Sequence, residues 1–264
     1  MAALTLYHSE MSVCAAKVRI VLAEKNVDWT SVLLNLRGGD AQKPDYLRLN
    51  PNAVVPTIVQ DGRPLIESTV ICEYLDDRWP DPPLKPPHAW DRARMRLWTK
   101  QLDEGVHAAV GTLSFCIAVR HELLARSAAD QARWVAGIPQ TDRRERSKAN
   151  LDKGVHSPYF APAAQRCAKL FADFDAALAG APWLAGEAFS LADVGFAPYL
   201  IRFKMFGLGL LFGRYPRVAE WAERVINRPS VQQGVSRWIG DGAAALYEKN
   251  RADGEHAFAA ILAG

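Results

Sequence analysis

Hydrophobic positions in the first eighty residues change between the two-residue period of strands and the wider period of helices. Ala3–Tyr7 and Trp29–Asn35 are apolar runs of strand length, and Val13–Lys25 between them has apolar residues at helical spacing. A polar segment, His8–Ser12, separates the first strand from this helix. The pattern therefore predicts a strand, a helix and a second strand in succession.

The rest of this segment predicts a hairpin flanked by two helices. Thr57–Gln60 and Pro64–Glu67 are strand-length runs joined by Asp61-Gly62, a dipeptide typical of tight hairpins. We expect a short helix at Tyr46–Leu49 and a longer one at Ser68–Arg78. The predicted order of elements is β-α-β-α-β-β-α.

A proline-dense segment, Asp81–Pro87, interrupts the pattern, because proline cannot continue a helix; such a segment is typical of a domain boundary. Only helical patterns follow it. They occupy Asp91–Ile117, Gln165–Ala179, Ser190–Phe206 and Arg217–Asn227. Between Arg120 and Phe160 the pattern is weak and rich in charge, which favours a solvated loop or surface helix. We expect an α/β domain over residues 1–80, a linker over 81–90 and an all-α domain over 91–264.

The composition is that of an ordinary globular protein. Of 264 residues, 49% are hydrophobic and 23% charged, and 32 Lys and Arg against 29 Asp and Glu leave a net charge of +3, which is too small to favour nucleic-acid binding. Apolar runs stay well below the roughly 18 residues of a membrane-spanning helix, and the first residues lack the pattern of a secretory signal. We therefore expect a cytoplasmic protein without membrane or nucleic-acid partners.

The four cysteines, Cys14, Cys72, Cys116 and Cys167, lie far apart and form no CxxC pair. Together with the histidines they have no zinc-ligand spacing, so we predict no metal site. Most are expected to be reduced thiols that pack as small apolar side chains. Cys14 alone is placed where chemistry is expected.

Val55-Pro56 directly precedes the predicted strand at Thr57. A proline there suggests a cis peptide bond that turns the backbone outward, where its N–H and C=O can pair with a peptide ligand as an added strand would. The alternative is a trans proline that starts an edge strand.

Glu67-Ser68 stands at the start of the helix Thr69–Arg78. Ser68 is placed to cap this helix, and the free N–H groups there favour a ligand carboxylate. The Glu67 carboxylate could accept from an ammonium group, so the pair would hold a zwitterionic amino-acid head. The alternative is a cap without a ligand.

The junction of the first strand and the first helix holds the candidate catalytic residues Ser9, Ser12 and Cys14. Ser12 is placed to cap the helix, at the positive end of its dipole. A ligand thiol there would have its pKa lowered by the dipole and by the donated hydrogen bond, which would make it a nucleophile. Cys14 could supply a thiol of its own, and Tyr7 is an alternative hydroxyl donor.

Several stretches of the chain resemble the cytosolic glutathione transferases. They are Ser12–Lys25, Asn50–Pro56, Glu67–Leu75, Ser190–Val194 and Arg228–Val231. The resemblance covers nearly the whole chain and implies a thioredoxin-like N-terminal domain that binds glutathione as a cosubstrate. It also implies an all-helical C-terminal domain that holds the second substrate, and a homodimer with sites near the subunit interface.

By this resemblance, Ser12 is the hydroxyl that activates the glutathione sulfur in serine-type members. Cysteine-type members have Cys at that place, whereas Cys14 matches a cysteine two residues further on that assists in some zeta-like enzymes. The backbone of Val55, before Pro56, is expected to pair with the cysteinyl unit of glutathione.

The same resemblance assigns Glu67-Ser68 to the γ-glutamyl head of glutathione, and Asp103 to the γ-glutamyl ammonium in the neighbouring subunit. Many relatives have Lys or Gln directly before the Val-Pro pair to hold the glycine carboxylate, whereas this chain has Val54. Either Lys43 or Gln42 takes that role, or glutathione binds less tightly.

Ser68–Asp76 and Arg94–Lys100 resemble the bacterial glutathione-dependent β-etherases, in which the glutathione thiolate displaces a phenolate from the carbon beside a carbonyl. A hydrophobic electrophile would lie against the early helices of the C-terminal domain. The candidate pocket residues are His107, Val110, Gly111, Leu113, Ser114 and Phe115, with Tyr159 or Phe206 as walls. For each of them the alternative is packing in the helical core, and His107 is the one that could orient a carbonyl.

Three functions remain open. The first is a glutathione transferase that acts by conjugation or thiolytic β-aryl ether cleavage, in detoxification or aromatic compound catabolism. The second is a glutathione-dependent isomerase or reductase in which Cys14 forms a mixed disulfide. The third is a non-catalytic binding protein with the same fold, for which Val54 is the one indication.

Overall fold

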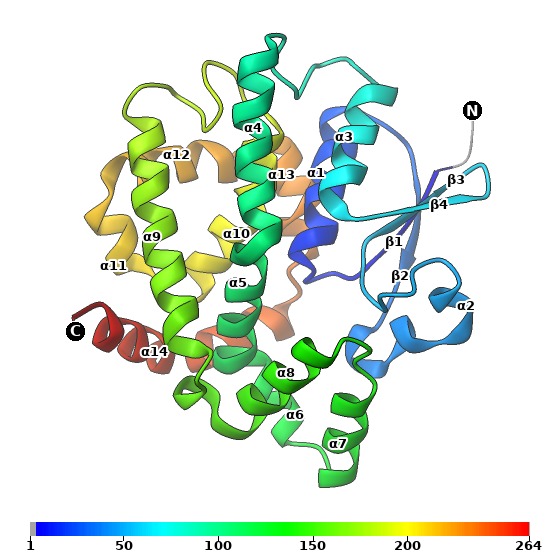
Figure 1. The fold of residues 1–264 in the computed structure, drawn as a ribbon, viewed down its shortest axis with the longest axis vertical. Helices are drawn as coiled ribbons and strands as arrows, with labels where there is room; N and C mark the ends of the chain where they lie inside the picture. The colour runs from blue at the N-terminus through cyan, green and yellow to red at the C-terminus, as the bar shows by residue number, and fades with distance from the viewer. Residues whose placement is uncertain (1–3, 264) are drawn as a thin grey trace.

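The structure is a computed structural model that describes residues 4–263; Ala3, at the start of the first predicted strand, lies outside them. The first part of the chain forms a four-stranded sheet with helices on both faces (Figure 1). Its elements are β1 (Leu4–His8), α1 (Val13–Glu24), β2 (Thr30–Leu33), α2 (Pro44–Leu47), β3 (Thr57–Gln60), β4 (Arg63–Ile66) and α3 (Ser68–Arg78). This is the predicted order of strands and helices.

Helices make up nearly all of the regular structure after the proline-rich segment. They are α4 (Ala89–Gln101), α5 (His107–Ser114), α6 (Arg120–Leu124), α7 (Ala128–Ala136), α8 (Thr141–Lys153), α9 (Phe160–Leu178), α10 (Leu191–Met205), α11 (Gly209–Arg214), α12 (Pro216–Ile226), α13 (Pro229–Gly234) and α14 (Asp241–Ala263). The fold is thus a thioredoxin-like sheet domain followed by an all-helical domain, as predicted.

The central helix of the second domain is unusually long. Two π-turns, Leu102–Val106 and Phe115–Val119, join α4, α5 and α6 into one helical stretch, Ala89–Leu124. By length and composition alone this stretch could cross a membrane, but 56% of its apolar window is buried within the protein. It packs against α9 and α10, which is typical of a core helix.

The sheet has the strand order β2-β1-β3-β4, in which β1 pairs parallel to β2 and antiparallel to β3. Alternate residues of β1 face opposite sides. Leu4 and Leu6 are buried in the main core with α1 and α3, whereas Tyr7 packs in a smaller cluster with Tyr46 of α2. In Figure 1, α1 and α3 accordingly lie between the sheet and the helical domain, and α2 lies on the other side.

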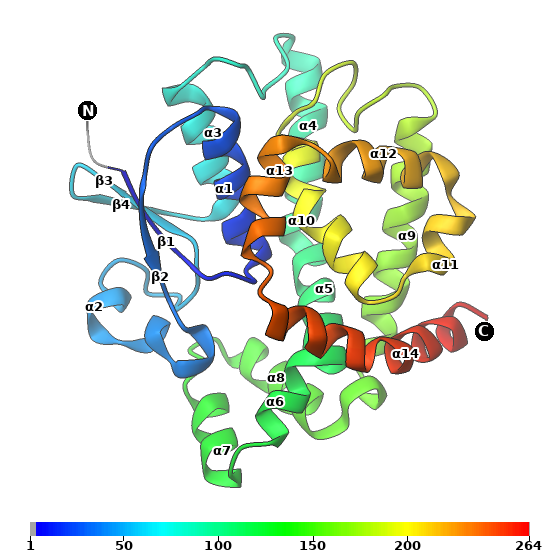
Figure 2. The ribbon, with the colours of Figure 1, turned by 180° about the vertical axis from the view of Figure 1, so that it is seen from behind.

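Helix α1 is the element that both domains share. It packs against α3 in its own domain and against α10 and α13 in the other (Figure 2). The contact with α13 is very close, because a Cβ on Gly234 would lie 2.7 Å from the Ile20 backbone nitrogen. The Arg19 side chain adds a hydrogen bond of 2.7 Å from its Nε to the Gly234 carbonyl.

Replacing Gly234 should therefore separate α13 from α1. We expect Gly234→Ala to lower the free energy of unfolding by about 1–3 kcal/mol, since the added methyl meets backbone rather than a flexible side chain. Gly213→Ala, where a Cβ meets nothing within 4 Å, is the matched control and should be neutral or slightly stabilising. Urea unfolding of both variants checks this, and equal stabilities would contradict it.

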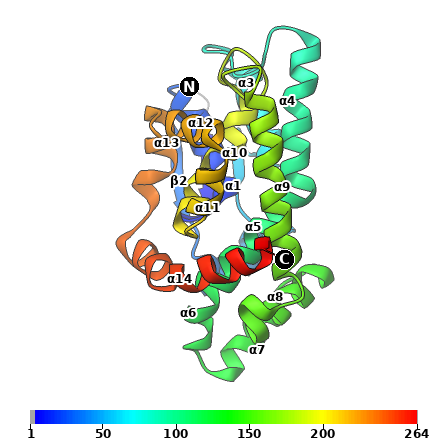
Figure 3. The ribbon, with the colours of Figure 1, turned by 90° about the vertical axis from the view of Figure 1, so that its left-hand side faces the viewer.

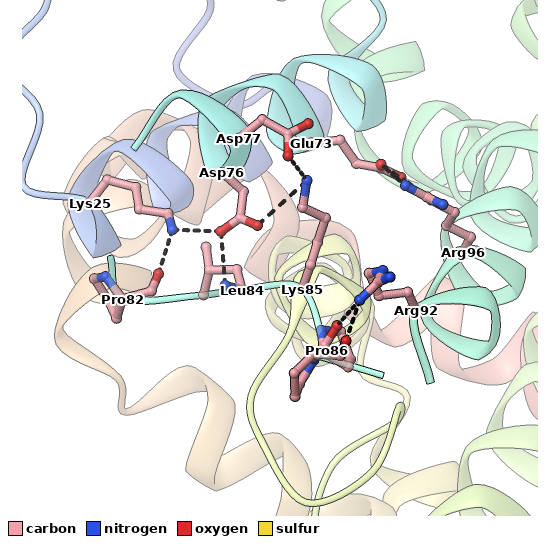
Figure 4. Close-up of polar contacts among 11 residues, drawn as sticks. Lys25, Glu73, Asp76, Asp77, Pro82, Leu84, Lys85, Pro86, Arg92 and Arg96 are labelled. Carbon is pink, nitrogen blue, oxygen red and sulfur yellow. Dashed lines mark hydrogen bonds and ion pairs between the residues drawn. The ribbon is translucent and has the colours of Figure 1, made fainter. Parts of the chain in front are cut away.

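The proline-rich segment is held in place by an ion-pair cluster (Figure 4). Lys25 and Asp76 are both buried, and the Lys25 Nζ donates to Asp76 Oδ1 at 2.5 Å and to the Pro82 carbonyl. The same Asp76 oxygen accepts from the Leu84 N–H at 2.8 Å. Lys85 pairs with Asp77 at the surface side of the cluster. The segment between the domains is therefore fixed to α1 and α3.

The weakly patterned segment after α5, predicted to be a solvated loop or a surface helix, forms three helices, α6, α7 and α8. Figure 3 shows α7 and α8 at one end of the molecule. Arg37 of the sheet domain pairs with Glu122 of α6, and the Arg37 carbonyl accepts from Arg126 at 3.1 Å. Gln140, just before α8, donates to the Asn52 carbonyl at 3.2 Å. These helices thus reach back to the sheet domain, which their charge pattern did not indicate.

His8 at the end of β1 is buried, and its ring is held by neighbouring side chains. Its Nε2 lies 2.7 Å from Ser31 Oγ and its Nδ1 3.1 Å from Arg19 Nη1, and its ring packs edge-on against Trp29 and Trp238. Burial and then the Arg19 charge lower the pKa of His8 to about 4. The folded protein therefore holds this ring neutral at pH values where the unfolded chain would protonate it.

This difference makes stability depend on pH. Between about pH 6.5 and 4 the unfolded state binds a proton at His8 that the native state does not, so stability falls as the pH is lowered. Over that range the loss from this one group should be on the order of 3 kcal/mol. Urea unfolding of the wild type and of His8→Asn at pH 7 and pH 4.5 isolates the contribution of His8. The other titrating groups affect both proteins equally, so they cancel when the two pH dependences are subtracted. Equal pH dependence in the two proteins would contradict a neutral His8.

Candidate active site

The start of α1 presents a serine hydroxyl. Ser12 is the N-cap, with extended backbone angles, and its Oγ accepts from the Ala15 N–H at 3.1 Å, as predicted. The hydroxyl oxygen is thus an acceptor in the cap, while its hydrogen remains available to a ligand. Ser9 contributes its backbone: its carbonyl accepts from Ser12 N at 3.2 Å and from Arg19 at 3.2 Å. The structure gives Ser9 a role in shaping this turn.

The segment before β3 is fixed by side chains of its own domain. The Val55–Pro56 peptide bond is cis. The Val54 carbonyl accepts from Tyr46 Oη at 2.5 Å and from Asn50 Nδ2 at 2.9 Å. Strand pairing begins only at Thr57, so the backbone of Val55 lies outside the sheet ladder.

The start of α3 differs from the prediction by one residue. Glu67 occupies the N-cap position, with φ of 68° and no side-chain cap, and Ser68 is already the first helical residue. The prediction that Ser68 caps this helix is therefore wrong, because the positive φ that ends the preceding strand falls on Glu67. Ser68 is buried, with 6% of its surface exposed.

Thr69, which sequence analysis did not single out, connects α3 to the helical domain. Its Oγ1 donates to Asp103 Oδ2 at 2.6 Å. The other Asp103 oxygen lies 3.8 Å from the Nζ of Lys17. Asp103 is 43% exposed, so the side chain expected to face a neighbouring subunit is partly engaged within its own chain.

Cys14 lies in the first turn of α1, against the helical domain. Its Sγ is 3.6 Å from His107 Nδ1, and that nitrogen is 2.9 Å from the hydroxyl of the buried Tyr199. Burial alone would raise the pKa of the Cys14 thiol, but the charges of His107 and Lys17 and hydrogen bonds from His107 and Ser68 lower it to about 6. The nearby Cys14 charge in turn raises the pKa of His107.

The other cysteines have the opposite environment. Burial raises the pKa of the Cys72, Cys116 and Cys167 thiols to about 12. All four cysteines are free, and Cys14 is the one that is not fully buried. The site therefore distinguishes one thiolate-forming cysteine from three inert ones.

The residues expected to hold the glycine carboxylate are at the surface. Lys43 Nζ pairs with Asp40 Oδ1 at 2.7 Å and the Lys43 side chain is 69% exposed. The Gln42 amide lies against Gly137 at the end of α7, where a Cβ would come within 2.5 Å of it. Gln42 thus contacts α7 from the sheet domain.

The candidate pocket residues divide between core and surface. Val110, Leu113 and Ser114 are buried, and Ser114 Oγ accepts from Arg202 at 3.2 Å. These three residues therefore fit packing in the helical core better than a substrate pocket. His107 and Gly111 are exposed on one face of α5, and a Cβ on Gly111 would meet nothing within 4 Å. Phe206 is fully buried and Tyr159 is 38% exposed.

Phe115, one helical turn beyond Gly111, stacks on Trp134 of α7 with ring centroids 5.6 Å apart. Both rings are partly exposed. Trp134 lies in the segment whose weak pattern predicted no packed helix, so sequence reasoning missed it. Among residues 4–263, no group of three His, Cys, Asp or Glu side chains could hold a metal ion.

Comparison with known families agrees with this geometry. The family model described as the glutathione S-transferase N-terminal domain matches residues 11–78, and that of the C-terminal domain matches residues 125–224. The chain belongs to the glutathione S-transferase family. Glutathione is the cosubstrate of that family.

Individual relatives are distant but cover nearly the whole chain. Glutathione S-transferase GstB of Escherichia coli is 25% identical over 240 residues, which are 88% of this chain and 97% of GstB. The protein LigF of a Sphingobium strain is 26% identical over 87% of this chain and 92% of its own. The crystal structure of LigF, which is called a beta-etherase, superimposes on this structure with a TM-score of 0.78. The match covers 89% of this chain and 99% of LigF, with 24% sequence identity.

The state of Cys14 can be measured directly. We expect iodoacetamide to modify one thiol at a rate that rises around pH 6, because only the thiolate reacts. In His107→Phe the midpoint should move to higher pH, since the neighbouring positive charge and hydrogen bond are lost. Intact-protein mass gives the rates, with Cys14→Ser as the blank. An unchanged midpoint in His107→Phe would contradict the pairing.

Proposed function

We propose that this protein is a glutathione S-transferase in which Ser12 holds the glutathione sulfur as a thiolate for attack on a hydrophobic electrophile. The observation that carries this proposal is the Ser12 cap. Its oxygen accepts from the Ala15 N–H, which leaves its hydrogen free to donate to a guest sulfur. The N-terminal end of α1 adds the positive side of the helix dipole. Both effects favour the charged sulfur.

The proposed position of glutathione follows the sheet domain. Its cysteinyl unit pairs with the backbone of Val55, and its γ-glutamyl head lies at Glu67-Ser68, where the free N–H groups of α3 attract a carboxylate. In this proposal Asp103 neutralises the γ-glutamyl ammonium of glutathione in the neighbouring subunit, and either Lys43 or Gln42 takes the glycine carboxylate. The position of Val55 outside the sheet ladder and the buried Ser68 at the start of α3 support this placement.

The proposed electrophile is aromatic and is consumed by conjugation or by thiolytic β-aryl ether cleavage. The exposed face of α5, with open space at Gly111 and the Phe115–Trp134 stack at its end, supports an aromatic guest. The relative LigF, which is called a beta-etherase, supports ether cleavage as one of the two reactions. Detoxification or aromatic compound catabolism would be the corresponding role.

We further propose a cytoplasmic homodimer, with residues 1–80 and 91–264 as its two domains in each chain. The reduced state of all four cysteines supports a cytoplasmic site. Val70 of α3 and Leu97 of α4 are 52% and 66% exposed. They lie beside a surface groove bordered by Glu73, Arg96 and other residues of both helices. This face supports a subunit contact.

A second candidate is a glutathione-dependent isomerase or reductase in which Cys14 carries the chemistry. The His107 pairing and lowered pKa of Cys14 favour it. The two candidates differ in which side chain is indispensable for turnover.

Turnover of a generic aryl halide and of a β-aryl ether ketone separates these candidates. We expect Ser12→Ala and Ser12→Gly to lose about 10²–10³ in kcat, the usual cost of removing one donor that stabilises a developing anion. Glycine is itself a tolerated N-cap, so Ser12→Gly keeps the helix start while removing the hydroxyl. Cys14→Ala should lose less than either.

Two results would decide against the proposal. Full activity in Ser12→Gly would remove Ser12 from the mechanism, and a larger loss in Cys14→Ala would favour the second candidate. Absence of a thiolate absorbance when glutathione is added to the wild type would indicate a binding protein without catalysis. Urea unfolding of each variant shows whether a loss comes from the site or from the fold.

A further inference from the structure

Helix α1 carries a buried ammonium group with no hydrogen bond. The Lys17 side chain is 1% exposed, and among residues 4–263 its Nζ has no hydrogen-bond partner. Asp103 lies 3.8 Å away but is directed to Thr69. A buried, incompletely paired charge lowers the stability of the folded protein. A nearby anion would reduce this destabilisation.

Cys14 is placed to be that anion. It precedes Lys17 by three residues, so the two side chains share a face of α1. On the other side of the sulfur are His107, 3.6 Å away, and Tyr199, whose hydroxyl is held by His107. Burial and the Cys14 charge raise the pKa of Tyr199 well above its usual value, so this phenol stays protonated and can donate.

We propose that Cys14 is a site of reversible S-glutathionylation by glutathione disulfide, with Lys17, His107 and Tyr199 as the positioning residues that hold its sulfur as a thiolate. This site is distinct from the Ser12 hydroxyl, which acts on the sulfur of a bound guest. It rests on the proposed function only in placing the glutathionyl group where glutathione binds.

The exchange balances without a further reactant. The Cys14 thiolate attacks one sulfur of glutathione disulfide, a Cys14–glutathione disulfide bond forms, and the original disulfide bond breaks. The leaving group is one glutathione thiolate, which takes a proton from water. A second glutathione thiolate reverses the step and regenerates the Cys14 thiolate and glutathione disulfide.

The adduct has a consequence for the transferase site. Cys14 and Ser12 both belong to the first turn of α1, and Ser68, assigned to the γ-glutamyl head, also contacts the Cys14 thiol. A glutathionyl group on Cys14 would therefore occupy the space that a free glutathione molecule needs. Glutathione disulfide should inhibit the enzyme covalently, and excess glutathione should restore it.

Intact-protein mass after incubation with glutathione disulfide tests the proposal. We expect one glutathionyl group on the wild type and none on Cys14→Ser, while Cys72→Ser, the control at an inert thiol, behaves as wild type. At pH 6, Lys17→Met and His107→Phe should react about tenfold more slowly than the wild type. A thiol with a normal pKa is mostly protonated at that pH, so little reactive thiolate is present. The greater intrinsic nucleophilicity of such a thiolate offsets only part of this decrease in rate. Reduction with excess glutathione should remove the group.

Other outcomes overturn the proposal. An unmodified wild type, an adduct that persists in Cys14→Ser, or wild-type rates and pH profiles in both Lys17→Met and His107→Phe would each do so. Because Lys17 is buried, Lys17→Met is scored only if urea unfolding shows a folded protein; His107→Phe, at an exposed position, tests the same arrangement independently.

Failure here is distinguishable from failure of the transferase proposal. Ser12→Gly should still take up the glutathionyl group, because the exchange does not use the Ser12 hydroxyl. Conversely, preincubation with glutathione disulfide should not reduce the transferase rate of Cys14→Ser, whatever that rate is before the incubation. Reduction of that rate to the same extent as in the wild type would refute the regulatory consequence.

Discussion

The structure depends on the burial of α1 between two domains. This helix covers one face of the sheet and is at the same time packed by α10 and α13, and at Gly234 the approach leaves no room for a side chain. Its first turn is consequently fixed with respect to both domains. A chemical site at that turn can therefore draw groups from the sheet domain, such as Ser68, and from the helical domain, such as His107, without either having to move.

Two buried cations of α1, Lys17 and Arg19, are two residues apart and therefore lie on opposite faces of the helix. Arg19 is saturated: it donates to the carbonyls of Ser9, Glu10 and Gly234 and contacts His8. Lys17 has one distant carboxylate and no hydrogen bond. A guanidinium whose three nitrogens are all engaged joins the domains. A buried ammonium with one carboxylate at 3.8 Å can stabilise a further anion, and the Cys14 thiolate is the one proposed here.

The sequence predicted those features that local patterns determine. Strand and helix periods placed every end of β1 to α3 within two residues, and the Ser12 cap follows from local chemistry. The Ser68 error is of the same kind, since helix starts are uncertain by a residue or two. The His107 partner of Cys14 lies 93 residues away, and no local pattern encodes such a contact. Helix α14 was missed because its apolar residues do not gather on one face, and Trp134 because the segment around it is rich in charge.

Identity near 25% with GstB and LigF fixes the architecture more firmly than the reaction, because the fold depends on the buried face of each helix and the reaction on a few exposed positions. Gly111 illustrates this: on a core helix an exposed glycine costs helix stability relative to alanine, and no packing contact compensates for it. The glycine leaves the surface of α5 beside His107 free of a side chain at the expense of helix stability. A proposed aromatic electrophile would use this surface, with the Phe115–Trp134 stack one helical turn beyond Gly111 and Cys14 next to His107.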